Sequence, residues 1–226
     1  MKKLFTNQRV TLFAALLCLV ALSASAAEVK KEFHREFTPI DNSTLTVINK
    51  YGSVVTETWD KNFVVVDVTV KVIHSSADRA RRILGMISVE FTEEDGNLKA
   101  ETIFSNEFSS ISWRGSNNSF SINYVIKMPA RVNFDVTNKY GNTVIDELSG
   151  LVRANVRYGN LTVDKLTRGN VKPLNTLMVA YGKATVYELG WAEINARYVG
   201  MFSVERATAL LVDSKYSKVS VERVSS

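Results

Sequence analysis

Alternating apolar and polar residues predict β-strands along most of the chain after residue 44. The predicted strands occupy residues 45–51, 63–73, 87–92, 98–104 and 120–128. Asp95-Gly96 predicts a turn between two of these strands. One helix is predicted at 76–85, because a serine stands at its start and a glycine at its end. The chain is therefore expected to be almost entirely β.

The strongest pattern is a repeat of about 18 residues in the region 130–226. The motif Asn-Lys-Tyr-Gly occurs at 49–52 and again at 138–141. Tyrosines then recur at intervals of 18, 23, 17 and 18 residues, at Tyr140, Tyr158, Tyr181, Tyr198 and Tyr216. Short alternating apolar runs flank each tyrosine, and glycine follows the first three directly. A unit this short can bury its apolar face only against neighbouring copies.

These units predict an all-β fold, a parallel β-solenoid of short coils of about 18 residues, with N-terminal strands and one short helix. A β-sandwich is the structural alternative, but it does not explain tyrosines at a nearly constant interval. The N-terminal strands are expected to form either an antiparallel meander or larger irregular coils. We expect the tyrosines to stack as a structural ladder, with an aromatic platform for sugars as the alternative.

The first 26 residues have the pattern of a secretory signal peptide. Lys2, Lys3 and Arg9 accompany an apolar run at 12–22, and small residues at 24–26 offer a cleavage site. The apolar run is about half of the ~20 residues that span a bilayer. The protein is therefore expected to be exported to the periplasm, the cell surface or the exterior. Residues 27–40 are predicted to be a charged tether, and 41–226 a single elongated β domain.

Removal of the signal peptide changes the composition that matters for function. It takes away Cys18, the only cysteine, so disulfides and thiol chemistry are excluded from the remaining 200 residues. It also takes away three basic and no acidic residues, which lowers the formal charge from +5 to +2. This small charge does not indicate nucleic-acid binding. No later stretch is long and apolar enough to predict a transmembrane segment.

Candidate catalytic residues are few, and we expect a protein that is not an enzyme. His34 and His74 are the only histidines, which leaves little for a catalytic triad or a metal site. His74 is predicted to be a solvated strand end. Acidic residues recur six or seven positions after each tyrosine, at Asp146, Asp164, Glu188, Glu205 and Glu222. We expect them to form a solvated edge interleaved with basic residues, and no cofactor or metal is expected.

Two groups of residues are candidates for binding. A basic stripe lies just before the tyrosines, and Ala180 interrupts it; its members are Lys139, Arg157, Arg197 and Lys215. By parity these side chains point outward, where they would attract an anionic polymer. The second candidate is a binding loop at 105–119 that carries Phe108 and Trp113.

The sequence also resembles a known group of proteins. The residues that carry the resemblance are Ser121–Pro129, Phe134–Gly141 and Tyr158–Leu161. They are similar to the bacterial putative adhesin domains of unknown function, a group that includes the GIN-type domains. The resemblance covers roughly residues 40–226, implies a secreted or envelope-located β-solenoid, and brings no catalytic residues with it.

Three functions follow from these patterns. The first is a non-catalytic binding module of the bacterial envelope or surface, whose partner is a surface polysaccharide or an envelope protein. The alternatives are a periplasmic accessory or sensory protein with a protein partner, and a polysaccharide-active β-helix enzyme. The last strand has no evident proline cap, so we expect it either to be shielded by a neighbouring segment or to stack end-to-end in an oligomer.

Overall fold

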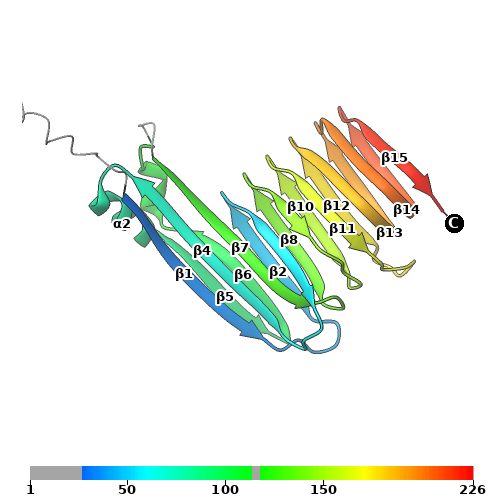
Figure 1. Cartoon of the computed structure of the whole chain (residues 1–226), viewed down its shortest axis with the longest axis horizontal. Coiled ribbons are helices and arrows are strands. Elements are labelled where there is room, and N and C mark those ends of the chain that lie inside the picture. Colours follow the sequence, from blue (N-terminus) through cyan, green and yellow to red (C-terminus); the bar gives the residue numbers. More distant parts are fainter. Residues whose placement is uncertain (1–26, 114–117, 226) are drawn as a thin grey trace, which may run out of the picture.

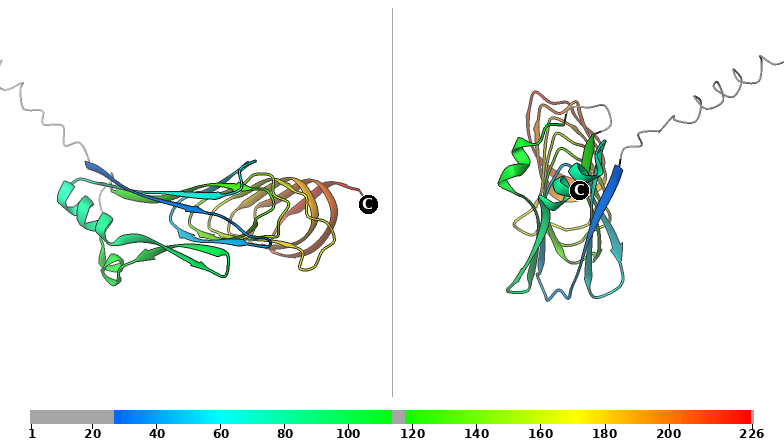
Figure 2. Two further views of the ribbon diagram at one scale, coloured as in Figure 1. Left: turned by 90° about the horizontal axis from the view of Figure 1, so that it is seen from below. Right: turned by 90° about the vertical axis from the view of Figure 1, so that its left-hand side faces the viewer.

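The computed structural model describes residues 27–113 and 118–225 as an elongated body (Figures 1 and 2). The predicted signal peptide at 1–26 lies outside the described residues. All strands belong to one 15-stranded sheet. They are β1 (Ala27–Phe37), β2 (Thr44–Lys50), β3 (Val54–Trp59), β4 (Val64–His74), β5 (Ile87–Glu94), β6 (Asn97–Phe104), β7 (Ser119–Pro129), β8 (Asn133–Lys139), β9 (Thr143–Ile145), β10 (Val152–Arg157), β11 (Leu161–Leu166), β12 (Asn175–Ala180), β13 (Lys183–Arg197), β14 (Met201–Lys215) and β15 (Val219–Val224).

The prediction of a parallel β-solenoid is wrong. The strands form a mixed sheet, wound into a nearly closed barrel shape, because antiparallel ladders join β1 to β4, β4 to β7 and β5 to β6. The other ladders are parallel. Alternation of apolar residues fixes which face of a strand is buried, and it does so equally in parallel and antiparallel pairs. The sequence pattern therefore left the pairing of the N-terminal strands open.

The sheet folds back on itself through its long C-terminal strands (Figure 1). The first half of β13 pairs with β11, and its second half pairs with β12. One layer therefore contains β7, β3, β9 and β11, and the facing layer contains β6, β2, β8, β10 and β12. The apolar residues of both layers meet between them as one core, whose largest fully buried members include Phe134, Phe202 and Tyr124.

Residues 27–37 form strand β1, although the sequence predicted a tether here. β1 pairs with β4 along its full length. Val29 and Phe33 are partly buried against the core, and Phe37 is 3% exposed. Charged residues fill most of the remaining positions, as is typical of an edge strand that avoids further pairing. Those charges masked the apolar alternation in the sequence.

The predicted helix and hairpin are confirmed. Helix α2 spans Ala77–Gly85, and the Ser76 hydroxyl accepts a hydrogen bond from the backbone N–H of Arg79. Ala80 and Ile83 are buried where the helix covers the N-terminal end of the core. Asp95 and Gly96 have φ angles of 50° and 72°, which suit the tight turn between β5 and β6.

In each turn of the repeat, the residue with the left-handed backbone conformation is the tyrosine and not the glycine. Six tyrosines have φ between 53° and 68°: Tyr51, Tyr140, Tyr158, Tyr181, Tyr198 and Tyr216. The glycine that follows each of the first four tyrosines is required for another reason. A Cβ on Gly141 would lie 1.8 Å from the carbonyl oxygen of Gly52, and a Cβ on Gly159 would lie 1.9 Å from that of Gly141. The backbones of successive turns are therefore in direct contact.

A small polar network lies inside the core beside these turns. The Thr102 hydroxyl donates to Asn49 Oδ1 at 3.1 Å and lies 2.8 Å from the Tyr124 hydroxyl. The Asn49 amide donates to the carbonyl oxygen of Ile122 at 3.0 Å. Burial raises the pKa of Tyr124 to about 12. The network therefore holds a neutral phenol in the apolar interior.

We expect Gly159→Ala to lower the free energy of unfolding by about 3 kcal/mol or more, because the new methyl group displaces backbone. Gly200→Ala is the matched control, since a Cβ at Gly200 meets nothing within 4 Å. Urea denaturation of the two variants measures the difference. Equal stability of both variants would contradict the direct contact between turns.

We expect the wild-type protein to lose stability between pH 10 and pH 12 faster than Tyr124→Phe does. The unfolded phenol releases its proton near pH 10, whereas the folded phenol keeps it to about pH 12. The unfolded state therefore binds fewer protons in this window, and the contribution of Tyr124 falls by about 1.4 kcal/mol per pH unit. Denaturation at several pH values checks this, and parallel curves for the two proteins would be the opposite result.

Candidate binding surface

The six turn tyrosines form one continuous stack along the edge of the molecule, which we call the tyrosine column. Successive ring centroids from Tyr51 to Tyr216 are 4.8–5.1 Å apart, and the ring planes differ by 4–20°. This confirms the structural ladder predicted from the repeat. The side chains from Tyr140 onward are 41–71% exposed, although their parity along the strands matches the buried set. The left-handed φ turns each ring out to solvent.

Stacking offsets the strain of these turns. A left-handed backbone costs a non-glycine residue ~1–2 kcal/mol, and each stacked aromatic pair contributes ~0.5–1.5 kcal/mol. Tyr51 was missed as the first member of the column, because Tyr140, the corresponding tyrosine of the next repeat copy, lies 89 positions further along the chain. The shared motif Asn-Lys-Tyr-Gly at 49–52 and 138–141 was the signal that identifies it.

The predicted basic stripe is brought together beside the tyrosines, and we call it the basic column. Its members pair directly across five parallel ladders, in the order Lys50, Lys139, Arg157, Ala180, Arg197 and Lys215. Lys50 was missed for the same reason as Tyr51. The ammonium groups of Lys50, Lys139 and Lys215 lie 4.8–5.4 Å from the ring centroids of the tyrosines that follow them.

The cations of the basic column differ in whether an acid neutralises them. The Arg197 guanidinium forms an ion pair with Asp213, and this hydrogen bond lowers the pKa of the Asp213 carboxyl. In residues 27–113 and 118–225 no ion pair reaches Lys50, Lys139, Arg157 or Lys215. These four charges remain available to a ligand.

Ala180 marks a depression in the basic column. Its short side chain leaves a pocket of about 220 Å³ between Arg157 and Arg197. Asn155, Met178 and Asn195 supply the uncharged remainder of its walls. The residue that interrupts the stripe in the sequence therefore creates a hollow with an arginine on either side.

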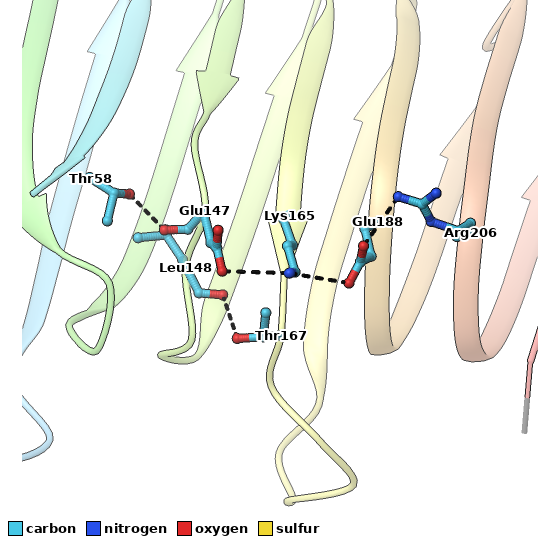
Figure 3. Close-up of polar contacts among 7 residues, drawn as sticks. All are labelled: Thr58, Glu147, Leu148, Lys165, Thr167, Glu188 and Arg206. Carbon is cyan, nitrogen blue, oxygen red and sulfur yellow. Dashed lines mark hydrogen bonds and ion pairs between the residues drawn. The ribbon is translucent and has the colours of Figure 1, made fainter.

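Two of the recurring acidic residues, Glu188 and Glu205, join a row of alternating charges on the opposite layer, as the sequence predicted. Figure 3 shows Lys165 between Glu147 and Glu188, at 3.7 Å and 3.5 Å, and Arg206 at 3.3 Å from Glu188. Asp146 has a different role, since its carboxylate accepts the backbone N–H of Thr58 at 2.7 Å. These carboxylates connect neighbouring strands, and the pocket of about 340 Å³ that Glu188 lines with Lys165 and Arg206 has no second carboxylate among the described residues of its lining.

Residues 105–113 of the predicted binding loop fold onto the N-terminal end of the tyrosine column, whereas residues 114–117 of the prediction lie outside the described residues. A 3₁₀ helix at Asn106–Ser110 carries Phe108, whose ring lies 4.6 Å from Phe104 and 6.0 Å from Trp113. Phe104 in turn contacts the edge of Tyr51 at 5.9 Å. The loop therefore extends the aromatic surface of the column.

The histidines occupy different positions from those expected. His74 was predicted to be solvated, but it is 4% exposed, and its Nδ1 accepts the backbone N–H of Ser76 at 3.0 Å. His34 lies on β1, where its hydrogen bond to Asp67 raises its pKa. Within the described ranges, no three histidine, cysteine or acidic residues are grouped so that they would hold a metal ion. None of the helices in those ranges has the length and apolar character to cross a membrane.

Comparisons with known proteins give only distant likenesses. No protein-family model matches the chain, and no curated protein does. A putative cell adhesion protein from Clostridium sporogenes is 13% identical, with a TM-score of 0.45 over 85% of this chain and 99% of its own. A putative adhesin from Parabacteroides merdae is 11% identical, with a TM-score of 0.30 over 84% and 96%.

A third structure, a putative lipid binding protein from Parabacteroides distasonis, is 12% identical, with a TM-score of 0.29 over 84% of this chain and 93% of its own. The solved structures that are similar to this chain thus include putative adhesins. At these identities and scores they assign neither a family nor a role.

We expect Tyr158→Ala to destabilise the protein by about 1–3 kcal/mol, because it removes two stacked contacts, at 5.0 Å and 4.8 Å. Tyr216→Ala removes one such contact at the end of the column and should cost about half as much. Tyr158→Phe keeps the stack and serves as the control. Urea denaturation gives the three values, and similar losses for Tyr158→Ala and Tyr216→Ala would show that stacking does not stabilise the column.

Proposed function

We propose that this protein is a non-catalytic binding module of the bacterial envelope or surface, and that it holds an anionic surface polysaccharide along the basic and tyrosine columns. The observation that carries this proposal is the basic column, in which four cations have no acidic partner in the described ranges. The predicted export signal and the family resemblance favour the location.

The arrangement of the columns suits an extended polymer better than a small ion. Consecutive strands of a sheet are ~4.8 Å apart, so charges and rings recur at that interval along the edge. A flexible anionic chain that follows the edge meets several cations at once, and each additional contact raises the effective affinity. The depression at Ala180 gives one anionic group a place between Arg157 and Arg197.

The carboxylates support a role without catalysis. Glycoside hydrolysis needs one carboxyl group that donates a proton and a second that acts as a base or nucleophile. Glu147 and Glu188, the closest candidates, both contact Lys165, and their side chains are 52% and 40% exposed. The two carboxylates therefore share one cation and are open to solvent, where they join neighbouring strands.

We expect Arg157→Ala to weaken binding to immobilised polygalacturonate about three- to fivefold, because an exposed charge contact contributes up to ~1 kcal/mol. Arg197→Ala should have a smaller effect, since Asp213 already neutralises that guanidinium. Ala180→Leu should also weaken binding by filling the depression. The measurement is the salt concentration that elutes each variant of the full chain.

A neutral galactan resin is the control for this experiment, and it should retain none of the variants. Retention that is insensitive to salt and to Arg157→Ala would overturn the proposal. It would favour the alternative function, an accessory protein with a protein partner. Release of shortened oligosaccharides from the resin would favour the enzyme alternative instead.

A further inference from the structure

A pocket of about 480 Å³ lies where the tyrosine and basic columns begin. Lys50 and Tyr51, the first members of the two columns, form one side of it. The other side comes from Phe104 at the end of β6 and from the loop that follows, including Phe108 and Trp113. The pocket is therefore continuous with the surface to which the polymer is proposed to bind.

The aromatic walls of the pocket support one another. Trp113 stacks on Phe120 with ring centroids 4.7 Å apart and planes 29° from parallel. Phe108 contacts Phe120 edge-on at 5.1 Å. The Tyr51 ring stacks on the Tyr140 ring, with centroids 5.1 Å apart. Each of these rings therefore packs against a neighbour, and such contacts favour a site that is formed before the ligand binds.

The charges around the pocket favour an anion. Lys50 is the only charged residue of its lining, which contains no acid. Glu107 lies in the same 3₁₀ helix, but its carboxylate is 3.5 Å from the guanidinium of Arg82 on the helix side of the loop. Polar groups on the rim come from Ser105, Asn106 and Ser109. The pocket thus combines aromatic faces, one cation and a few hydrogen-bonding groups.

We propose that this pocket binds an acidic monosaccharide unit at the end of the anionic polysaccharide. Aromatic faces pack against the C–H bonds of a sugar ring, while Asn106 and the serines can bond its hydroxyl groups. The Lys50 ammonium binds the carboxylate of the sugar. This inference rests on the proposed function and adds an end-specific site to the contacts made along the column.

Digalacturonate is the probe that tests the pocket, because it is too short to span the basic column. We expect one molecule to bind per chain and to change the fluorescence of Trp113, assigned with Trp113→Phe. Lys50→Gln should weaken binding at least threefold. Asn106→Ala, a substitution on the exposed rim, should weaken it as well and is the second variant if one of the others perturbs the loop.

Two controls separate this inference from the proposed function. Arg157→Ala should leave digalacturonate binding unchanged while it weakens polygalacturonate retention, and neutral galactobiose should bind at least fivefold more weakly than digalacturonate. Two results would overturn the proposal that the pocket binds an acidic sugar. In the first, the protein retains polygalacturonate but does not bind digalacturonate. In the second, Arg157→Ala abolishes digalacturonate binding and Lys50→Gln does not. If the protein binds digalacturonate but does not retain polygalacturonate, only the proposal that the basic column binds the polymer would be overturned.

Discussion

One backbone hydrogen bond per turn fixes both columns at once. The N–H of each column tyrosine from Tyr51 to Tyr198 donates to the carbonyl oxygen of the basic-column position on the adjacent strand, at 2.8–3.1 Å. The bond ties the tyrosine turn of one unit to the cation position of the next. The glycine carbonyl contacts lock the same register, because they leave no space for a side chain between successive turns. Tyrosines and cations are therefore aligned as a consequence of how the strands pair.

The two rows of charged residues, which lie on opposite layers of the sheet, differ in how the signs of their charges are arranged. Along the edge shown in Figure 3, Glu147, Lys165, Glu188 and Arg206 alternate in sign, so neighbouring strands attract. Along the basic column, Lys50, Lys139 and Arg157 follow one another with the same sign, and such neighbours repel by ~0.9 kcal/mol per pair at the dielectric constant of water. If stability were the only constraint, charges of alternating sign would be favoured in both rows. A column of one sign is therefore a cost in stability that a bound anion would remove.

Local features of the fold were predictable from sequence, and the pairing of its N-terminal strands was not. The helix at 77–85 and the hairpin at Asp95-Gly96 follow from capping and turn chemistry within a few residues. The antiparallel ladders of β4 with β1 and β7 depend on contacts between distant segments, which alternation does not encode. The basic and tyrosine columns were predicted where the repeat is regular, and they were missed at Lys50 and Tyr51, where an insertion separates the copies.

The contacts between turns weaken toward the C-terminal end of the sheet. Val199 takes the place of glycine after Tyr198, and Gly200 has open space where its neighbours have none. On β14, Leu211 and Val212 are 57% and 46% exposed, whereas Ile194, which pairs with Val212 from β13, is 1% exposed. The end-to-end oligomer predicted from the sequence would cover these side chains, and it stays a prediction. The N-terminal end differs, because aromatic rings pack against the first tyrosine of the stack there. The pocket that Lys50 lines beside these rings therefore favours this end as the place where a ligand would bind.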